Sequence, residues 1–226
     1  MPIFARKADF KSFKISAVNL NREEMNVDFS YLEGTNCYCD PESAGTIRQR
    51  IAELPLNELH CIGTGDYHYL SLFFLERISE PFTLILMDKH PDDQSCAFGD
   101  GLLSCGSWVA QARRLPLCRS SVWIRDYADI GKLAGVEGSI YLSIDLDVLD
   151  PEYARTNWDQ GEMSLEQLLE ICVRAAGSHR LLGADICGGL SPEKGGTPGT
   201  EALNRSTTAA LESCLRPLLS KYENND

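Results

Sequence analysis

Acidic and imidazole side chains gather in two short segments of this sequence. The first, Met87–Asp93, reads M-D-K-H-P-D-D, and the second, Ser143–Pro151, reads S-I-D-L-D-V-L-D-P. Within each segment the side chains able to bind a cation are spaced by two residues: Asp88, His90 and Asp92, then Asp145 and Asp147. Because alternate residues of an extended chain face the same side, each set is expected to point in one direction.

Carboxylates that converge on one place call for a cation. They repel one another and raise each other's pKa unless a positive charge compensates them. Oxygen ligands with one or two imidazoles suit manganese better than zinc, which favours sulfur and nitrogen. These carboxylates and imidazoles are more ligands than one ion usually binds in a protein. We therefore expect two Mn²⁺ ions about 3.5–4 Å apart, although other divalent cations would fit. The alternative is ordinary turn chemistry, in which aspartates after a strand cap the next helix, as Asp150-Pro151 suggests.

His68 is a further candidate ligand. It follows Gly63-Thr64-Gly65-Asp66-Tyr67, a turn between an apolar run and a helical pattern. A histidine at a helix start is often a hydrogen-bonded structural residue instead, and that reading stays open.

Each acidic segment follows a run typical of a buried strand, Phe82–Met87 (FTLILM) and Ser139–Ile144. Further strands are expected at Phe13–Val18, Leu59–Gly63, Ser121–Ile124 and Arg180–Ile186. Helices are expected at Glu42–Leu54, Tyr69–Arg77, Trp108–Leu115, Tyr127–Leu133, from Ser164 onward, and Thr200–Leu219. This alternation predicts a three-layer α/β fold, a mostly parallel sheet with helices on both faces, in one domain covering 1–226. Ligands of such sheets bind beyond the carboxyl ends of the strands, where both acidic segments lie.

Composition and net charge limit the classes of binding partner that we expect. Hydrophobic residues make up 43% and the net charge is −12, so we expect neither a nucleic-acid nor a membrane partner. A cationic small molecule is compatible with this charge. The cysteine count of nine is odd, no signal-peptide pattern is recognisable at Met1–Lys14, and no apolar run could span a membrane. We therefore expect a cytoplasmic protein with free thiols.

The acidic segments resemble the ureohydrolases, the arginase and agmatinase family of binuclear manganese hydrolases. The family motifs are G-G-D-H-S, D-A-H-x-D and S-x-D-x-D-x-x-D-P. Here they read G-T-G-D-Y-H-Y, which fits loosely, D-K-H-P-D, and a full match from Ser143. The likeness runs in order from Cys61 to Leu215, while the N-terminal part is shorter than the family norm.

The resemblance implies a role for each ligand and a reaction. Asp88 and Asp145 would bridge the ions, His68 and Asp92 would complete one, and His90 and Asp147 the other. A metal-bridging hydroxide would attack the sp² carbon of a linear guanidine or amidine and break a C–N bond, with Asp92 and Asp145 contributing to catalysis. Relatives of this family also imply a homo-oligomer.

Two departures concern the substrate side. The family histidine that follows the second motif is replaced by Cys105, beside Ser104, and the family glutamate that grips the guanidinium is replaced by Gly188. Cys105 is therefore a candidate for catalysis or, with Ser104 and Gly188, for lining the substrate pocket. Without that glutamate a guanidinium loses its main anchor, unless Glu193 or Glu201 approaches from the flanking loop.

Other functions remain open. One is a metal-binding, non-catalytic relative that binds a small ligand, and another is a deacetylase-like amide hydrolase with one ion. A hydrolase that uses Cys105 as its nucleophile is a third. Specificity loops are expected at 97–107, 153–162 and 188–200, where Tyr153 and Trp158 could form an aromatic wall.

Overall fold

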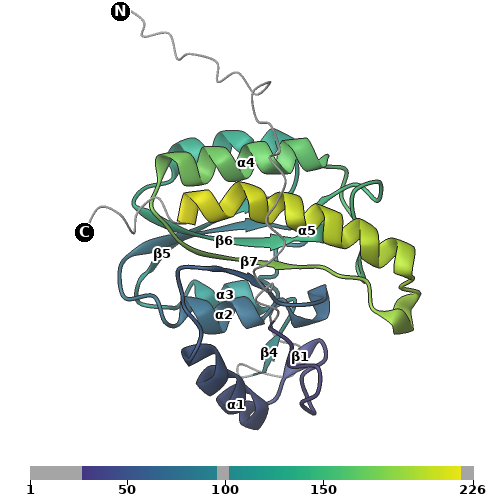
Figure 1. The fold of residues 1–226 in the computed structure, drawn as a ribbon. Coiled ribbons are helices and arrows are strands. Elements are labelled where there is room, and N and C mark those ends of the chain that lie inside the picture. The colour runs from purple at the N-terminus through teal and green to yellow at the C-terminus, as the bar shows by residue number, and fades with distance from the viewer. Residues whose placement is uncertain (1–26, 96–101, 220–226) are drawn as a thin grey trace, which may run out of the picture.

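The computed structural model describes residues 27–95 and 102–219, in the order of elements shown in Figure 1. The strands are β1 Tyr38–Cys39, β2 Leu59–Cys61, β3 Phe82–Met87, β4 Leu103–Ser104, β5 Cys118–Ile124, β6 Ser139–Asp145 and β7 Leu181–Cys187. The helices are α1 Pro41–Ala52, α2 Leu70–Leu75, α3 Trp108–Ala112, α4 Leu165–Ser178 and α5 Pro198–Leu219, with short 3-10 turns at Gly65–Tyr67, Tyr127–Gly135, Leu146–Val148 and Pro192–Lys194.

Five strands form one parallel sheet in the order β2-β7-β6-β3-β5. Helices α4 and α5 cover one face, and α1, α2 and α3 lie on the other (Figure 1). The predicted fold class, a three-layer α/β architecture, is confirmed. β1 and β4 pair separately as a short antiparallel ribbon, which two-residue strands do not reveal in a sequence.

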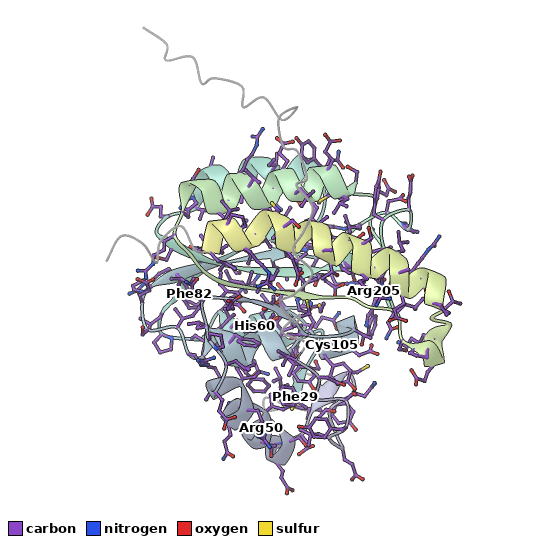
Figure 2. The ribbon with its side chains drawn as sticks, viewed as in Figure 1. Phe29, Arg50, His60, Phe82, Cys105 and Arg205 are labelled. Atoms are coloured by element: carbon purple, nitrogen blue, oxygen red, sulfur yellow. The ribbon has the colours of Figure 1, made fainter. Side chains whose placement is uncertain are left out.

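Two hydrophobic cores hold the layers together, one on each face of the sheet. Phe29, labelled in Figure 2, belongs to the core on the side of α1, α2 and α3. Strand β3 is buried along its whole length, because residues such as Leu84 face one core and residues such as Ile85 the other. Burial of both faces therefore explains why every residue of FTLILM except Thr83 is apolar, and the Thr83 hydroxyl lies 2.9 Å from Ser120 Oγ.

Local signals place the helix starts. Asp40 caps α1 by accepting hydrogen bonds from the backbone of Glu42 and Ser43, and Ser164 forms a capping box with Gln167 at the start of α4. The expected helices at 69–77 and 108–115 end earlier than predicted, since their last residues form turns. The segment 127–133 is a 3-10 turn rather than an α-helix.

Not every predicted segment belongs to the part of the chain that the structure describes. The strand predicted at 13–18, and residues 97–101 of the first specificity loop, lie outside the described residues. In the part of the chain that is described, the cysteines form no disulfide bonds, and no helix has the length and apolarity that crossing a membrane requires.

Candidate metal centre

The three central strands end at one level of the sheet. Met87 of β3 and Ile186 of β7 are both in register with Ile144 of β6. The next residues along the three strands are Asp88, Asp145 and Cys187, with Asp145 paired to Cys187. Residues in register on parallel strands project to the same face, so the row faces the side of α2 and α3.

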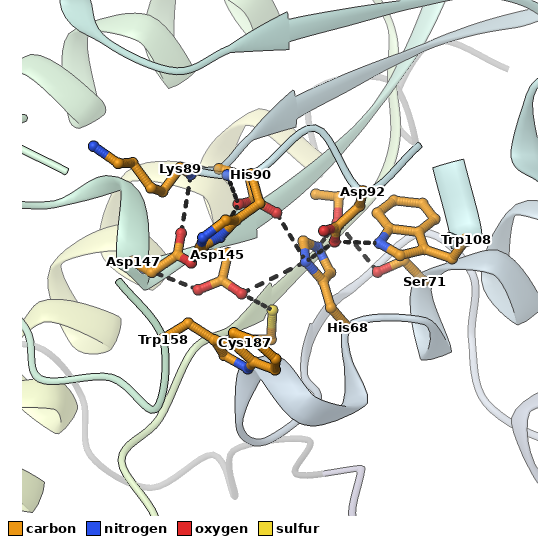
Figure 3. Close-up of polar contacts among 12 residues, drawn as sticks. His68, Ser71, Lys89, His90, Asp92, Trp108, Asp145, Asp147, Trp158 and Cys187 are labelled. Carbon is orange, nitrogen blue, oxygen red and sulfur yellow. Dashed lines mark hydrogen bonds and ion pairs between the residues drawn. The ribbon is translucent and has the colours of Figure 1, made fainter. Parts of the chain in front are cut away.

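His68 joins this row from the turn that precedes α2. Its Nδ1 lies 3.1 Å from Asp88 Oδ2, 3.1 Å from Asp92 Oδ2 and 3.5 Å from Asp145 Oδ2 (Figure 3). The imidazole is buried, and Nδ1 makes no hydrogen bond of acceptable geometry. A buried ring nitrogen aimed at three carboxylates without a hydrogen bond is what a metal ligand looks like when the ion is taken away.

A second group adjoins the first through Asp88. His90 Nδ1 lies 2.8 Å from Asp147 Oδ2 and 3.5 Å from Asp88 Oδ1. The backbone N–H of Lys89 donates to Asp147 Oδ1 at 3.0 Å, and the backbone N–H of Asp147 donates to Asp145 Oδ1 at 2.9 Å (Figure 3). These bonds hold Asp145 and Asp147 side by side. The ligand atoms of His68, Asp88 and Asp92, and those of Asp88, His90 and Asp147, each lie within 4.8 Å of one another.

A buried hydroxyl relay fixes the orientation of the His68 ring. Ser143 Oγ donates to Asp185 Oδ1 at 2.7 Å and lies 2.9 Å from His68 Nε2. Ser71 of α2 donates to the same aspartate oxygen at 3.0 Å. Because the Ser143 proton is directed at Asp185, its oxygen accepts the Nε2–H of His68. Nδ1 is then the ring atom that faces the carboxylates, and its lone pair is the one that a metal ion would use.

The electrostatics of the cluster are unfavourable without a cation. Burial raises the pKa of Asp145, and the neighbouring Asp147 and Asp88 raise it further. Burial also raises the pKa of Asp92 and of Asp147. The hydrogen bond to Asp147 raises the pKa of His90 to about 10. The metal-free cluster therefore holds protons at pH values where isolated aspartates would be ionised, and a divalent cation would replace them.

Asp92 is held in a strained conformation. Its φ is 47°, in the left-handed region that non-glycine residues seldom adopt. The indole N–H of Trp108 donates to Asp92 Oδ2 at 2.8 Å, and the backbone N–H of Val109 donates to its carbonyl oxygen at 3.0 Å. The first turn of α3 thus aims this carboxylate at His68.

Cys105 and Ser104, which were predicted to contact substrate, have different surroundings. Burial, with Cys37 and Asp92 nearby, raises the pKa of Cys105 to about 12, so its thiol is neutral in the metal-free protein and a poor nucleophile. The Ser104 hydroxyl donates to Ser107 Oγ at 2.8 Å, which engages it within its own turn.

Gly188 lies where a side chain would collide with the cluster. Its φ is +101°, and a Cβ built there would lie 2.3 Å from Asp145 Oδ1 and 2.6 Å from the backbone nitrogen of Leu146. Any side chain at this position would displace a candidate ligand. The local backbone at position 188 therefore suits glycine and not a residue with a side chain.

Trp158 lies at the edge of the cluster. Its ring centroid is 6.2 Å from that of His90, and its indole N–H donates to the buried Asp66 at 2.9 Å. Lys194 lies over the indole at 5.2 Å and 3.6 Å from Asp66. Trp158 accordingly has the position expected of an aromatic wall.

The other loop candidates lie apart from the cluster. Tyr153 packs against the core under α4 and α5. Glu201 is exposed and pairs with Arg205, and Glu193 is exposed. Glu201 also lines a pocket that includes Cys187, but within the described residues neither acid forms a hydrogen bond or an ion pair with the cluster.

Sequence reasoning missed Cys187, Trp108 and the pair Ser143 and Asp185. A signal for the pair existed, because polar residues alternate with apolar ones in β6 and β7 just before the strand ends. Such alternation inside a strand buried on both faces marks polar groups with a buried partner. Cys187 and Trp108 carry no comparable signal, since both types are ordinary in a core.

Comparisons with known proteins indicate a family and a fold. The model of the arginase family matches residues 124–209. A curated protein of Thermotoga maritima, described as uncharacterized, is 34% identical over 166 residues, which is 66% of either chain.

Solved structures share the fold. A hypothetical agmatinase from Burkholderia thailandensis aligns with a TM-score of 0.62 at 23% identity, over 84% of this chain and 69% of that one. Proclavaminate amidino hydrolase from Streptomyces clavuligerus gives 0.61 at 16% identity over 80% and 72%, and arginase from Medicago truncatula gives 0.58 at 19% over 77% and 65%.

Proposed function

Because this chain belongs to the arginase family, we propose that it is a metal-dependent hydrolase that breaks a C–N bond in a linear guanidine or amidine. The observation that supports this most is His68 Nδ1, which is buried, lacks a hydrogen bond and faces three carboxylates. The adjoining group of Asp88, His90 and Asp147 could hold a second ion. We propose two Mn²⁺ ions, held by His68, Asp88, His90, Asp92, Asp145 and Asp147.

The donor set fits such a centre. Asp88 belongs to both ligand groups, and the two oxygens of Asp145 face Asp147 and His68 respectively, so both carboxylates can bridge. When bound, a pair of divalent cations lowers the pKa of a shared water and stabilises charge that develops on the substrate.

The surrounding residues position these groups. Ser143 and Asp185 fix the His68 tautomer, and Trp108 orients Asp92. His90 is about one-third exposed and hydrogen-bonded to Asp147, so it can exchange a proton with solvent at the edge of the site. Asp92 and Asp145 stay the candidates for direct catalysis, whereas the neutral thiol of Cys105 fits better as part of the pocket lining.

We expect this protein to hold its substrate differently from a site in which a glutamate binds the guanidinium. Position 188 offers no carboxylate, and both Asp66 oxygens already accept hydrogen bonds, from Asn157 and Trp158. We propose that Trp158 stacks against the planar reacting group or its neighbour. The net charge of −12 is compatible with a cationic small molecule.

The test is a substrate panel with manganese-loaded protein. Urea and ammonia release would be measured across guanidines and amidines of varied tail, with Asp145→Asn as the inactive variant and Asp150→Asn as its matched control. Asp150 lies in the same segment, but its carboxylate accepts a hydrogen bond from the backbone of Glu152 within its own turn. Turnover that Asp145→Asn abolishes and Asp150→Asn preserves supports the proposal.

Position 188 offers no carboxylate to hold a guanidinium for reaction. This favours one alternative, a relative that binds metal and a small ligand without turnover. Full metal loading with no product from any panel member would favour that alternative. A protein saturated by one ion, and active on amides only, would favour the deacetylase-like function instead.

A further inference from the structure

Cys187 lies closer to the metal centre than a core cysteine needs to. It ends β7 in register with Asp145, is 1% exposed, and its Sγ lies 3.1 Å from Asp145 Oδ2. That oxygen is also 3.5 Å from His68 Nδ1. The ligand atoms of His68, Asp145 and Cys187 all lie within 4.8 Å of one another.

We propose that Cys187 is a sulfur ligand of the ion on the His68 side, and that this position therefore prefers a thiophilic divalent cation such as Zn²⁺, Co²⁺ or Fe²⁺ to the Mn²⁺ that the family resemblance alone suggests. The inference rests on the proposed metal-dependent function and refines it, because it makes the two halves of the centre unequal. The His90 side retains oxygen and nitrogen donors alone, a set that suits Mn²⁺.

The strand register leads directly to this arrangement. Asp88, Asp145 and Cys187 occupy one row on three neighbouring parallel strands and project to the same face. Two members of the row are carboxylates of the candidate centre, and the third carries sulfur. The chain turns away at Gly188, whose lack of a side chain leaves Asp145 undisturbed.

The metal-free contact is a thiol that donates to a carboxylate. When a divalent cation enters between Sγ and His68 Nδ1, the thiol proton is released to solvent and the sulfur lone pair binds the ion. The products are one metal–thiolate bond and one proton, with no change of oxidation state. If Cys187 merely filled space, its sulfur would stay protonated and no metal–sulfur bond would form.

Cobalt(II) distinguishes the two cases, because a cobalt–thiolate bond produces an intense near-ultraviolet charge-transfer band, while oxygen and nitrogen ligands do not. Metal-stripped full-length protein would be titrated with Co²⁺ in oxygen-free buffer. Wild type, Cys187→Ser and Cys105→Ser would be compared, the last because Cys105 is another thiol near His68. The visible ligand-field bands report cobalt binding independently of sulfur.

We expect the charge-transfer band in wild type and Cys105→Ser, and its loss in Cys187→Ser with the ligand-field bands retained. Changes around a metal site commonly alter affinity by roughly ten- to a hundredfold, so the preference for Zn²⁺ over Mn²⁺ should fall by at least about tenfold in Cys187→Ser. Ligand-field bands without a charge-transfer band in wild type would overturn this inference and leave the proposed function standing. No cobalt binding at all would overturn both.

A second measurement covers the case in which Cys187→Ser does not fold. X-ray absorption at the cobalt edge of the wild-type protein should show one sulfur scatterer at about 2.3 Å, as in zinc–thiolate bonds. A first shell of oxygen and nitrogen alone would contradict the proposal.

Discussion

Replacing Asp145 with asparagine should stabilise the metal-free protein and remove its response to metal. The aspartate is 3% exposed, and its buried neighbours Asp88, Asp92 and Asp147 are also acidic. Asparagine keeps the acceptor for the backbone N–H of Asp147 and deletes one charge. The predicted change thus has opposite signs in the presence and absence of metal.

The magnitude follows from the raised pKa. Burial and the neighbouring carboxylates raise the pKa of Asp145 above its unfolded value, so its ionisation costs stability as the pH rises through the folded-state pKa. One pKa unit is worth about 1.4 kcal/mol, so relief of one or two units would contribute about 1–3 kcal/mol. At about 2–4 °C per kcal/mol for a domain of this size, Tm should rise by several degrees near neutral pH. The gain should vanish below about pH 4, where this carboxyl is protonated in the unfolded chain as well.

The metal response should behave in the opposite way. Wild type at a free Mn²⁺ concentration of about 1,000 times Kd should gain about 4 kcal/mol from each site, and the variant should lose most of this gain. Thermal unfolding followed by circular dichroism, with chelator and then with Mn²⁺, measures both effects, and Asp150→Asn serves as the control. A variant that is less stable than wild type without metal, yet equally stabilised by Mn²⁺, would refute the reasoning.

Three further predictions follow from the same geometry. Gly188→Glu, which restores the family residue type, should lower metal occupancy instead of creating a guanidinium site, because its Cβ would collide with Asp145 and Leu146; metal analysis with arginine and agmatine assays checks this, and gained urea release would contradict it. Trp108→Phe should weaken metal affinity by roughly ten- to a hundredfold, because it removes the hydrogen bond that orients Asp92; calorimetry measures the loss, and unchanged affinity would contradict the positioning role. Finally, Mn²⁺ affinity should rise from about pH 5 to about pH 9, since protons held by the raised-pKa carboxylates compete with the ion; a flat calorimetric profile would count against the ligand set.

Much of the fold was predictable from local pattern. FTLILM predicted β3 to the residue, and the Ser164–Gln167 capping box located the start of α4. The strand-end rule also placed Asp88 and Asp145 together, since parallel neighbours end at one edge. These features depend on side-chain periodicity and short-range hydrogen bonds, which a sequence displays directly.

Other features depend on tertiary pairing and were not accessible. The 3-10 turn at Tyr127–Gly135 differs from an α-helix by a small backbone change that hydrophobic spacing does not resolve. The nearness of Cys187 to Asp145 depends on the register between β7 and β6, and the meaning of Gly188 on its positive φ. The sequence leaves His68 open as a structural residue or a ligand, because the nearness of its Nδ1 to Asp88 and Asp92 depends on tertiary packing.

The central claim is a two-ion centre on this set of histidines and aspartates. Elemental analysis of the purified protein after saturation with Mn²⁺ and removal of free metal tests it most directly, with Asp145→Asn and Asp150→Asn measured in parallel. The account predicts about two ions per chain in wild type and Asp150→Asn, and a marked loss in Asp145→Asn. Wild-type protein that retains no metal, or an Asp145→Asn variant with wild-type metal content, would contradict it.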